Sequence, residues 1–79
     1  MAVTVTLSTT LRGRVPGYEP ARGLSLEWDG PISTRALAEK IGLPLDEIKI
    51  IMLNGRHAAL DQAVSDGDRV SYFPAVGGG

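Results

Sequence analysis

The sequence contains no cysteine, and its 79 residues include a single histidine, tryptophan and phenylalanine. Without cysteine the chain has no disulfide, no thiolate metal site and no thiol nucleophile. With His57 as its only imidazole, a histidine metal cage or a catalytic Ser/His dyad with spare partners is hard to build. We therefore expect no metal site and no bound cofactor, and a protein that is not a free-standing enzyme.

An excess of charge of one sign is also lacking. Eight Lys and Arg residues face nine Asp and Glu residues, which gives a formal net charge of −1, so no basic field for nucleic acid or acidic lipid is expected. The N-terminal segment lacks the layout of a signal peptide, and no apolar run approaches a membrane span. These absences predict one cytoplasmic domain with neither a nucleic-acid nor a membrane partner.

The first third of the chain predicts two paired strands. Residues 3–8 alternate Val or Leu with Thr and Ser, and residues 24–28 alternate Leu or Trp with Ser and Glu. This period of two is typical of half-buried strands. The segment 10–23 is rich in Gly and Pro and predicts a long connection, with one helical turn near Leu11.

One helix is predicted in the middle of the chain. Ser33 and Thr34 are both good N-cap residues, and Gly42 suits the left-handed position after a helix. Leu37 and Ile41 fall on one helix face, four residues apart. We therefore expect a helix of two to three turns between the cap and Gly42.

The second half predicts the rest of a sheet. Residues 50–53 are all apolar, which indicates a strand covered on both faces or a central strand. Asn54-Gly55 predicts a type I′ hairpin turn, and Asp66-Gly67-Asp68 predicts a turn rather than a calcium loop. The remaining predicted elements are a short turn at 44–48, a return strand at 56–60 and a last strand at 69–73, closed by Pro74.

This order, β-β-α-β-β-β, predicts an α+β fold in which a mixed sheet of four to five strands packs on one main helix, the ubiquitin-like β-grasp. Trp28 and Tyr72 are expected in or near the core. Alternation turns Val70 and Tyr72 inward and Phe73 outward, and an outward aromatic residue indicates a docking patch.

The C-terminus ends in three glycines. A glycine tail stays flexible unless a partner captures it, and the five residues after Pro74 span up to about 17 Å when extended. Such a tail threads a narrow channel and presents the Gly79 carboxylate to another enzyme, although a disordered end or a cloning remnant would look the same. We divide the chain into a domain, 1–74, and a flexible tail, 75–79.

Residues 54–79 resemble the C-terminal third of the MoaD/ThiS family, which comprises the small subunit of molybdopterin synthase and the sulfur carrier of thiazole biosynthesis. The residues that carry the resemblance are Asn54, Leu60-Asp61, Asp66-Gly67-Asp68, Val70, Tyr72-Phe73, Pro74-Ala75-Val76 and Gly78-Gly79. Ala75 stands where the family often has a second proline, and Gly77 is an additional glycine. The N-terminal strand and the helix are similar in a less specific way.

The resemblance implies a reaction at the C-terminus. A ubiquitin-activating-like enzyme uses Mg-ATP to adenylate the Gly79 carboxylate, and a sulfur donor of the cysteine desulfurase or rhodanese type converts it to a thiocarboxylate that serves a larger synthase subunit. The implied reactive residues are Gly79 and Gly78. The implied partner-binding residues are Phe73, Val76, Gly77, His57, Ser8 and Arg12. Ser8 and His57 depart from the apolar character of the family's patch.

Several functions fit these observations. The long 10–23 connection favours a molybdopterin or tungstopterin carrier over a thiazole carrier, and tRNA or an amino-acid precursor are further sulfur acceptors. A ubiquitin-like modifier that forms isopeptide conjugates is an alternative of a different class. A plain interaction module with an inert tail is another.

Overall fold

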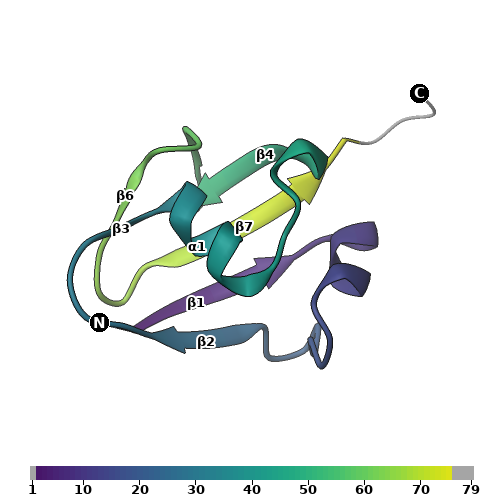
Figure 1. Cartoon of the computed structure of the whole chain (residues 1–79), viewed down its shortest axis with the longest axis horizontal. Helices are drawn as coiled ribbons and strands as arrows, with labels where there is room; N and C mark the ends of the chain where they lie inside the picture. The colour runs from purple at the N-terminus through teal and green to yellow at the C-terminus, as the bar shows by residue number, and fades with distance from the viewer. Residues whose placement is uncertain (1, 76–79) are drawn as a thin grey trace.

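In the computed structural model, which describes residues 2–75, a five-stranded mixed sheet packs against one α-helix (Figure 1). The strands are β1 (Ala2–Leu7), β2 (Leu24–Glu27), β4 (Ile48–Leu53), β5 (Arg56–Ala58) and β7 (Arg69–Pro74). Their order is β2-β1-β7-β4-β5. The first and last strands pair in parallel, and the other neighbours pair antiparallel. This confirms the predicted α+β β-grasp fold and the predicted β1–β2 pairing.

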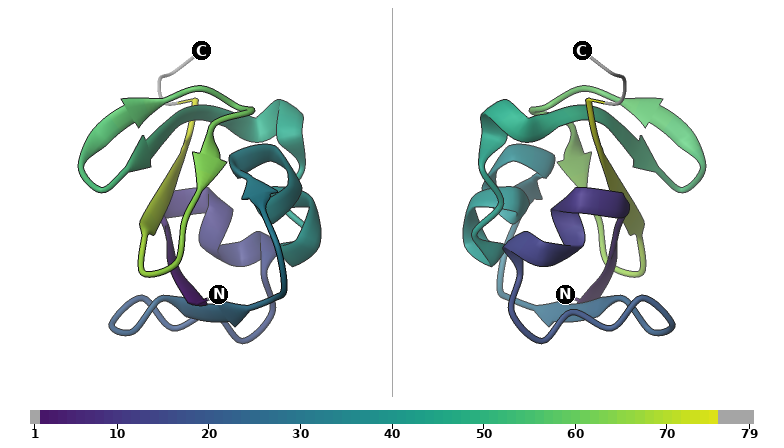
Figure 2. Two further views of the ribbon diagram at one scale, coloured as in Figure 1. Left: turned by 90° about the vertical axis from the view of Figure 1, so that its left-hand side faces the viewer. Right: turned by 90° about the vertical axis from the view of Figure 1, so that its right-hand side faces the viewer.

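The helix α1 (Thr34–Ile41) lies on one side of the sheet (Figure 2). The side chain of Ser33 accepts a hydrogen bond of 3.1 Å from the amide of Ala36, and Gly42 follows the helix with a φ of 85°. Both predicted helix ends are therefore confirmed. Leu37 is fully buried and Ile41 packs against the core.

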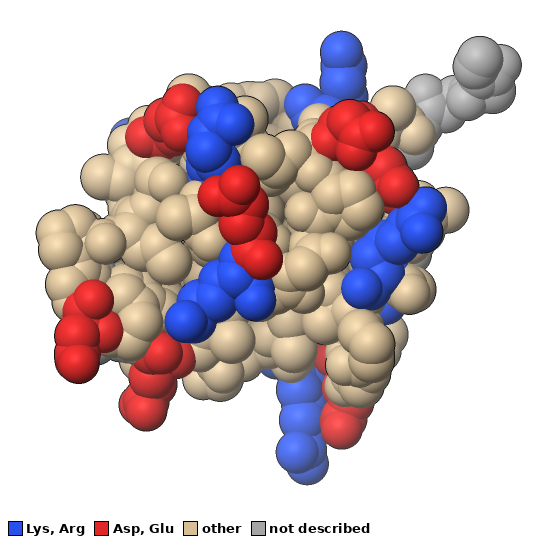
Figure 3. Space-filling view, viewed as in Figure 1, with Lys and Arg blue, Asp and Glu red and all other residues tan. Residues whose placement is uncertain are grey.

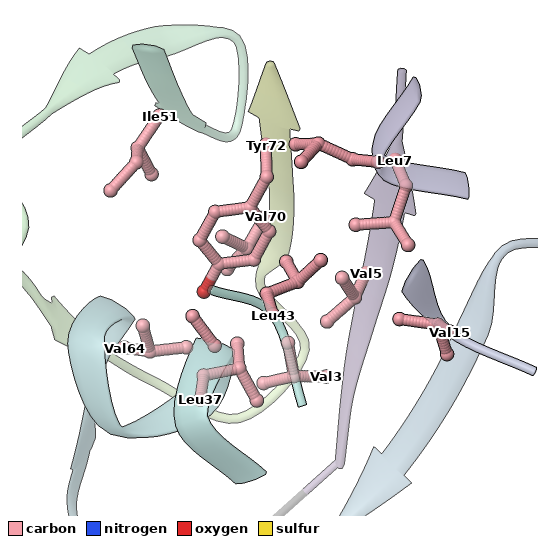
Figure 4. Packing of buried hydrophobic residues seen from close by; sticks show 12 residues of the cluster. Val3, Val5, Leu7, Val15, Leu37, Leu43, Ile51, Val64, Val70 and Tyr72 are labelled. Carbon is pink, nitrogen blue, oxygen red and sulfur yellow. The ribbon is translucent and has the colours of Figure 1, made fainter. Parts of the chain in front are cut away.

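The core fills the space between α1 and the inner face of the sheet (Figure 4). Alternate residues of the two central parallel strands point into it, as the period of two requires. Tyr72 is fully buried at its centre, and Trp28 packs at its edge, as expected. The buried strand residues are Val3, Val5, Leu7, Ile51, Val64, Val70, Tyr72 and Pro74.

The predicted hairpin turn is confirmed, but the strand that follows it is shorter than expected. Asn54 and Gly55 have φ values of 51° and 83°, the two positive values that a type I′ turn needs. The return strand β5 ends at Ala58 instead of residue 60. The carbonyls of Ala59 and Leu60 instead accept hydrogen bonds from the Thr34 hydroxyl, which draws the chain away from β4.

The connection between β1 and β2 belongs to the core. Its helical turn is a 3₁₀ helix, η1 (Thr9–Arg14), and Leu11 within it is fully buried. A second 3₁₀ helix, η2 (Leu45–Glu47), forms the turn expected at 44–48. The sequence did not predict the small sheet of β3 (Ile32–Ser33) and β6 (Ala63–Val64), because two residues are too few to show a periodicity.

Residues 50–53 were expected to form a strand covered on both faces or a central strand, and the second alternative is confirmed. β4 has neighbours on both sides, β7 and β5, but its outer face is not covered, because Ile50 is 39% exposed. The predicted tail begins at Ala75, which is exposed. Val76 to Gly79 lie outside the described residues, so the division at residue 74 and the flexibility of the tail stay predictions.

Candidate partner-docking site

The candidate site lies on the outer face of the sheet, opposite α1. Burial along β7 alternates, with Val70 and Tyr72 buried and Ser71 and Phe73 partly exposed. Phe73 therefore points outward, as the alternation predicted. Across the sheet, Ile50 of β4 lies opposite Phe73.

Phe73 lines a shallow cleft on this face. Met52 lies opposite Ser71 on one side and opposite His57 on the other, which brings the side chains of three strands together. The cleft has a volume of about 300 Å³, and its lining is almost entirely apolar. The lining residues are Ile50, Met52, His57, Phe73 and Pro74.

The other predicted partner-binding residues lie beside the cleft or beyond the described chain. The amide of Ser8 donates a hydrogen bond of 3.2 Å to the carbonyl of Tyr72, which places Ser8 next to β7 on the β1 side. Arg12 is exposed, and its Nε donates to the carbonyl of Leu7 at 3.0 Å. The structure thus brings Phe73 and His57 together in one cleft and leaves Ser8 and Arg12 outside its lining.

The four remaining predicted site residues, Val76, Gly77, Gly78 and Gly79, lie outside the described residues. Their roles stay predictions. The structure does show where this segment begins. Pro74 lines the cleft, and Ala75 directly follows it.

The motif residues around the last turn stabilise the fold. The Asn54 amide nitrogen donates to the Asp68 carboxylate at 2.9 Å, while the Asn54 amide oxygen accepts from the backbone of Arg69 at 2.9 Å. The Ser65 amide donates to the same carboxylate at 2.7 Å. These two donors, the Ser65 amide first, lower the pKa of Asp68. Gly67 adopts a φ of 85°, so this segment is a turn, as predicted.

Asp61 also has a structural partner. Its carboxylate receives two hydrogen bonds from the Arg35 guanidinium of α1, at 2.7 and 3.2 Å. This pairing lowers the pKa of Asp61. Within residues 2–75, no cluster of three or more His, Asp or Glu side chains is placed to hold a metal ion.

Ile50 and Met52 are functional candidates that the sequence reasoning missed. The signal was present in the apolar run 50–53, which was interpreted as a strand covered on both faces or a central strand. A sheet with its single helix on one side needs only every second residue to be apolar. An uninterrupted run on such a sheet therefore leaves apolar side chains in water, which is typical of an interaction site.

The opposite face of the molecule has a different character. In the view that shows α1, acidic and basic side chains are interspersed (Figure 3), so no field of one sign develops there. No helix within the described part of the chain is long and apolar enough to cross a membrane.

Comparison with known proteins agrees with this architecture. The sequence model of the Mut7-C ubiquitin family matches residues 1–77. The chain belongs to this ubiquitin family. The crystal structure of SAMP1 from Haloferax volcanii has the same fold, with a TM-score of 0.70, 24% sequence identity and 100% coverage of both chains. No curated protein matches. These matches confirm the resemblance to MoaD/ThiS-type ubiquitin-like proteins.

Proposed function

We propose that this chain is a sulfur-carrier protein whose reactive group is the carboxylate of Gly79. An adenylating enzyme binds the domain and uses Mg-ATP to activate this carboxylate. A cysteine desulfurase or rhodanese-type donor then supplies sulfur, and the resulting thiocarboxylate delivers it to an acceptor held by a larger synthase subunit. The chain itself binds neither the nucleotide nor a metal.

The observation that carries this proposal is the end of β7. This strand is the middle strand of the sheet and ends at Pro74, which pairs with Ile48 and also lines the apolar cleft. Ala75 is already exposed. A partner that occupies the cleft is therefore next to the start of the glycine-rich segment that ends at Gly79.

The chemistry explains why such a carrier needs a partner. A carboxylate is a poor electrophile until one of its oxygens becomes part of a leaving group. Transfer of AMP from ATP to Gly79 provides that group and releases pyrophosphate. A persulfide sulfur then attacks the carbonyl carbon and expels AMP, and a thiol reduces the acyl disulfide to the thiocarboxylate. The carrier has no cysteine that would intercept its own acyl adenylate.

Among sulfur acceptors, a pterin that receives a dithiolene is favoured. The long 10–23 connection, whose 3₁₀ turn buries Leu11, exceeds what a minimal thiazole carrier needs. Membership of a ubiquitin family also supports a second candidate, a modifier whose C-terminus forms isopeptide bonds to lysines. The two candidates share adenylation and differ in the nucleophile that follows.

Intact-mass measurement after incubation with the adenylating enzyme, Mg-ATP and a persulfide donor tests the proposal. We expect one oxygen of the Gly79 carboxylate to be replaced by sulfur, and an alkylating reagent to trap the product at the C-terminus. Omission of ATP controls for alkylation of Met1 or Met52. Lysine-linked conjugates in place of a thiocarboxylate would favour the modifier. If neither product forms, a plain interaction module is the remaining function.

A further inference from the structure

The only asparagine of the chain, Asn54, is followed directly by a glycine. The pair forms the turn between β4 and β5, and both residues are exposed to water. Glycine has no Cβ to shield its own backbone nitrogen, and the space where a Cβ of Gly55 would stand is open. One exposed turn therefore contains both reactants of deamidation, a side-chain amide and the backbone nitrogen of the residue after it.

Deamidation is a cyclisation followed by hydrolysis. After losing its proton to water, the Gly55 nitrogen attacks the side-chain carbonyl carbon of Asn54. A carbon–nitrogen bond forms, the side-chain amide group leaves as ammonia, and a cyclic succinimide remains. Water then opens the ring at either carbonyl, which leaves aspartate or isoaspartate. Overall, water is taken up and ammonia is released, so the reaction needs no oxidant and no other reactant.

The fold holds both polar atoms of the Asn54 side chain. The side-chain nitrogen donates to the Asp68 carboxylate at 2.9 Å, and the side-chain oxygen accepts from the Arg69 amide at 2.9 Å. The backbone of Asn54 is held as well, because its amide donates to the Arg69 carbonyl at 2.8 Å. The side chain cannot turn toward the Gly55 nitrogen without breaking these bonds, and its leaving group is bound to a carboxylate.

Asp68, which holds the leaving group, is itself fixed in place. Its second carboxylate oxygen accepts from the Ser65 amide at 2.7 Å, and its own amide donates to the Ser65 carbonyl at 3.1 Å. A hydrogen bond to an ionised carboxylate is stronger than one between neutral groups. We call the bonded set of Asn54, Asp68 and Arg69 the latch, because it joins the β4–β5 turn to the start of β7.

We propose that Asn54 is a deamidation site whose reaction the latch slows, and that deamidation proceeds through local opening of the latch rather than through unfolding of the chain. The bonds of Asn54 to Asp68 and Arg69 lie at the exposed end of the hairpin. Such ends open at a lower free energy than the core. The site lies at the start of β7, whereas Pro74 ends that strand, so the inference applies to a carrier and to a modifier alike.

The product does not re-form the latch. Deamidation replaces the donor nitrogen of Asn54 by a carboxylate oxygen, which faces the Asp68 carboxylate across a gap now spanned by a hydrogen bond of 2.9 Å. Like charges at this distance repel each other. Deamidation therefore converts an attractive contact between the hairpin and β7 into a repulsive one and loosens the hairpin in aged copies of the chain.

Intact-mass measurement of the folded chain during long incubation at neutral pH tests the proposal. Exchange of the side-chain NH₂ for OH raises the mass, and with a single asparagine in the chain peptide mapping should place the change at Asn54 rather than Gln62. The same ring can form at Asp29-Gly30 and Asp66-Gly67, but hydrolysis there restores the original mass. The folded chain should react more slowly than the same chain unfolded in urea.

Two variants separate opening of the latch from unfolding. Asp68→Ala should raise the rate by about tenfold or more, since a factor of ten corresponds to about 1.4 kcal/mol, the scale of one hydrogen bond to a charged group. Tyr72→Phe weakens the fold away from the latch and should leave the rate nearly unchanged. Equal rates for wild type and Asp68→Ala, or an equal rise for Tyr72→Phe, would overturn the proposal. Should Asp68→Ala fail to fold, Asp68→Asn takes its place and should also react faster than wild type.

Chemical denaturation of Asn54→Asp measures the effect of the product. This variant should unfold more readily than wild type at neutral pH. The double variant Asn54→Asp/Asp68→Asn exchanges the two side chains, so that the amide can donate from the opposite side of the latch, and it should regain part of the lost stability. A double variant no more stable than Asn54→Asp alone would show that repulsion between the two carboxylates is not the cause, and would overturn this part of the proposal.

Discussion

The phenolic hydroxyl of Tyr72 donates a hydrogen bond of 2.7 Å to the backbone carbonyl of Thr34, the first residue of α1. This bond ties the middle strand of the sheet to the start of the helix. Burial raises the pKa of the Tyr72 phenol, so the group remains a neutral donor. The next residue, Phe73, points the other way, into the docking cleft. Two adjacent aromatic residues therefore face opposite sides of the sheet, with Tyr72 in the core and Phe73 in the cleft.

Tyr72→Phe should lower the free energy of unfolding by about 1–2 kcal/mol, because it removes a buried hydrogen bond while keeping the ring in the core. Chemical denaturation of the variant and the wild-type chain measures the difference. Adenylation should proceed with an unchanged KM, since the ring does not reach the outer face. A fully stable variant would mean that the hydroxyl contributes nothing to the contact between strand and helix.

Phe73→Ala should weaken binding to the partner and have little effect on the stability of the fold. The side chain is only partly buried, so the loss in unfolding free energy should stay below about 1 kcal/mol. Residue types at a strand position differ in stability by about this much. Binding to the adenylating enzyme should weaken, as measured by calorimetry. If the variant instead lost several kcal/mol, Phe73 would belong to the core and the register of β7 would be off by one residue.

The length of the tail should matter as much as its composition. Deleting Gly79, or adding one residue after it, should abolish adenylation, because the carboxyl carbon then no longer reaches the nucleotide in the partner's active site. Pyrophosphate exchange measures this, and thermal unfolding should be unchanged since the domain is intact. Exchange that persists in the truncated chain would contradict the proposed mechanism.

Stability should fall in acid partly because of Asp68. Its pKa is lowered in the folded protein, first by the Ser65 amide and then by Asn54. A lowered folded pKa contributes stability that is present above the unfolded value, about 3.9, and that is lost as the pH falls through the folded value. Thermal unfolding from neutral pH down to about pH 3 measures this loss.

Asp68→Asn should unfold more readily than the wild-type chain at neutral pH, and the difference between the two should shrink as the pH falls. The variant removes the charge that the Ser65 amide and the Asn54 side chain stabilise. A constant difference across the whole range would show that the charge of Asp68 contributes nothing. Asp46→Asn, at an exposed aspartate in η2, is the matched control.

The sequence by itself determined the features that depend on neighbouring residues. Ser33 and Gly42 specify the ends of α1, and Asn54-Gly55 specifies the hairpin, because each acts through its own backbone angles or a hydrogen bond within one turn. The alternation of residues within β7 was enough to predict that Phe73 points outward. The family resemblance likewise rests on a contiguous stretch of sequence.

Only the tertiary structure decided which surfaces are covered. Leu11 is fully buried although it lies in a loop-like segment, and Ile50 is exposed although it lies in an apolar run. Gly23 lies so close to β1 that an added Cβ would come within 2.7 Å of the Val5 carbonyl oxygen. The periodicity of a segment fixes which side chains share a face, but whether water or another element covers that face depends on pairings between residues far apart in the chain. The docking cleft is such a face, since it is formed by three strands from two separate segments of the chain and left open because the only α-helix of the described residues packs on the other side.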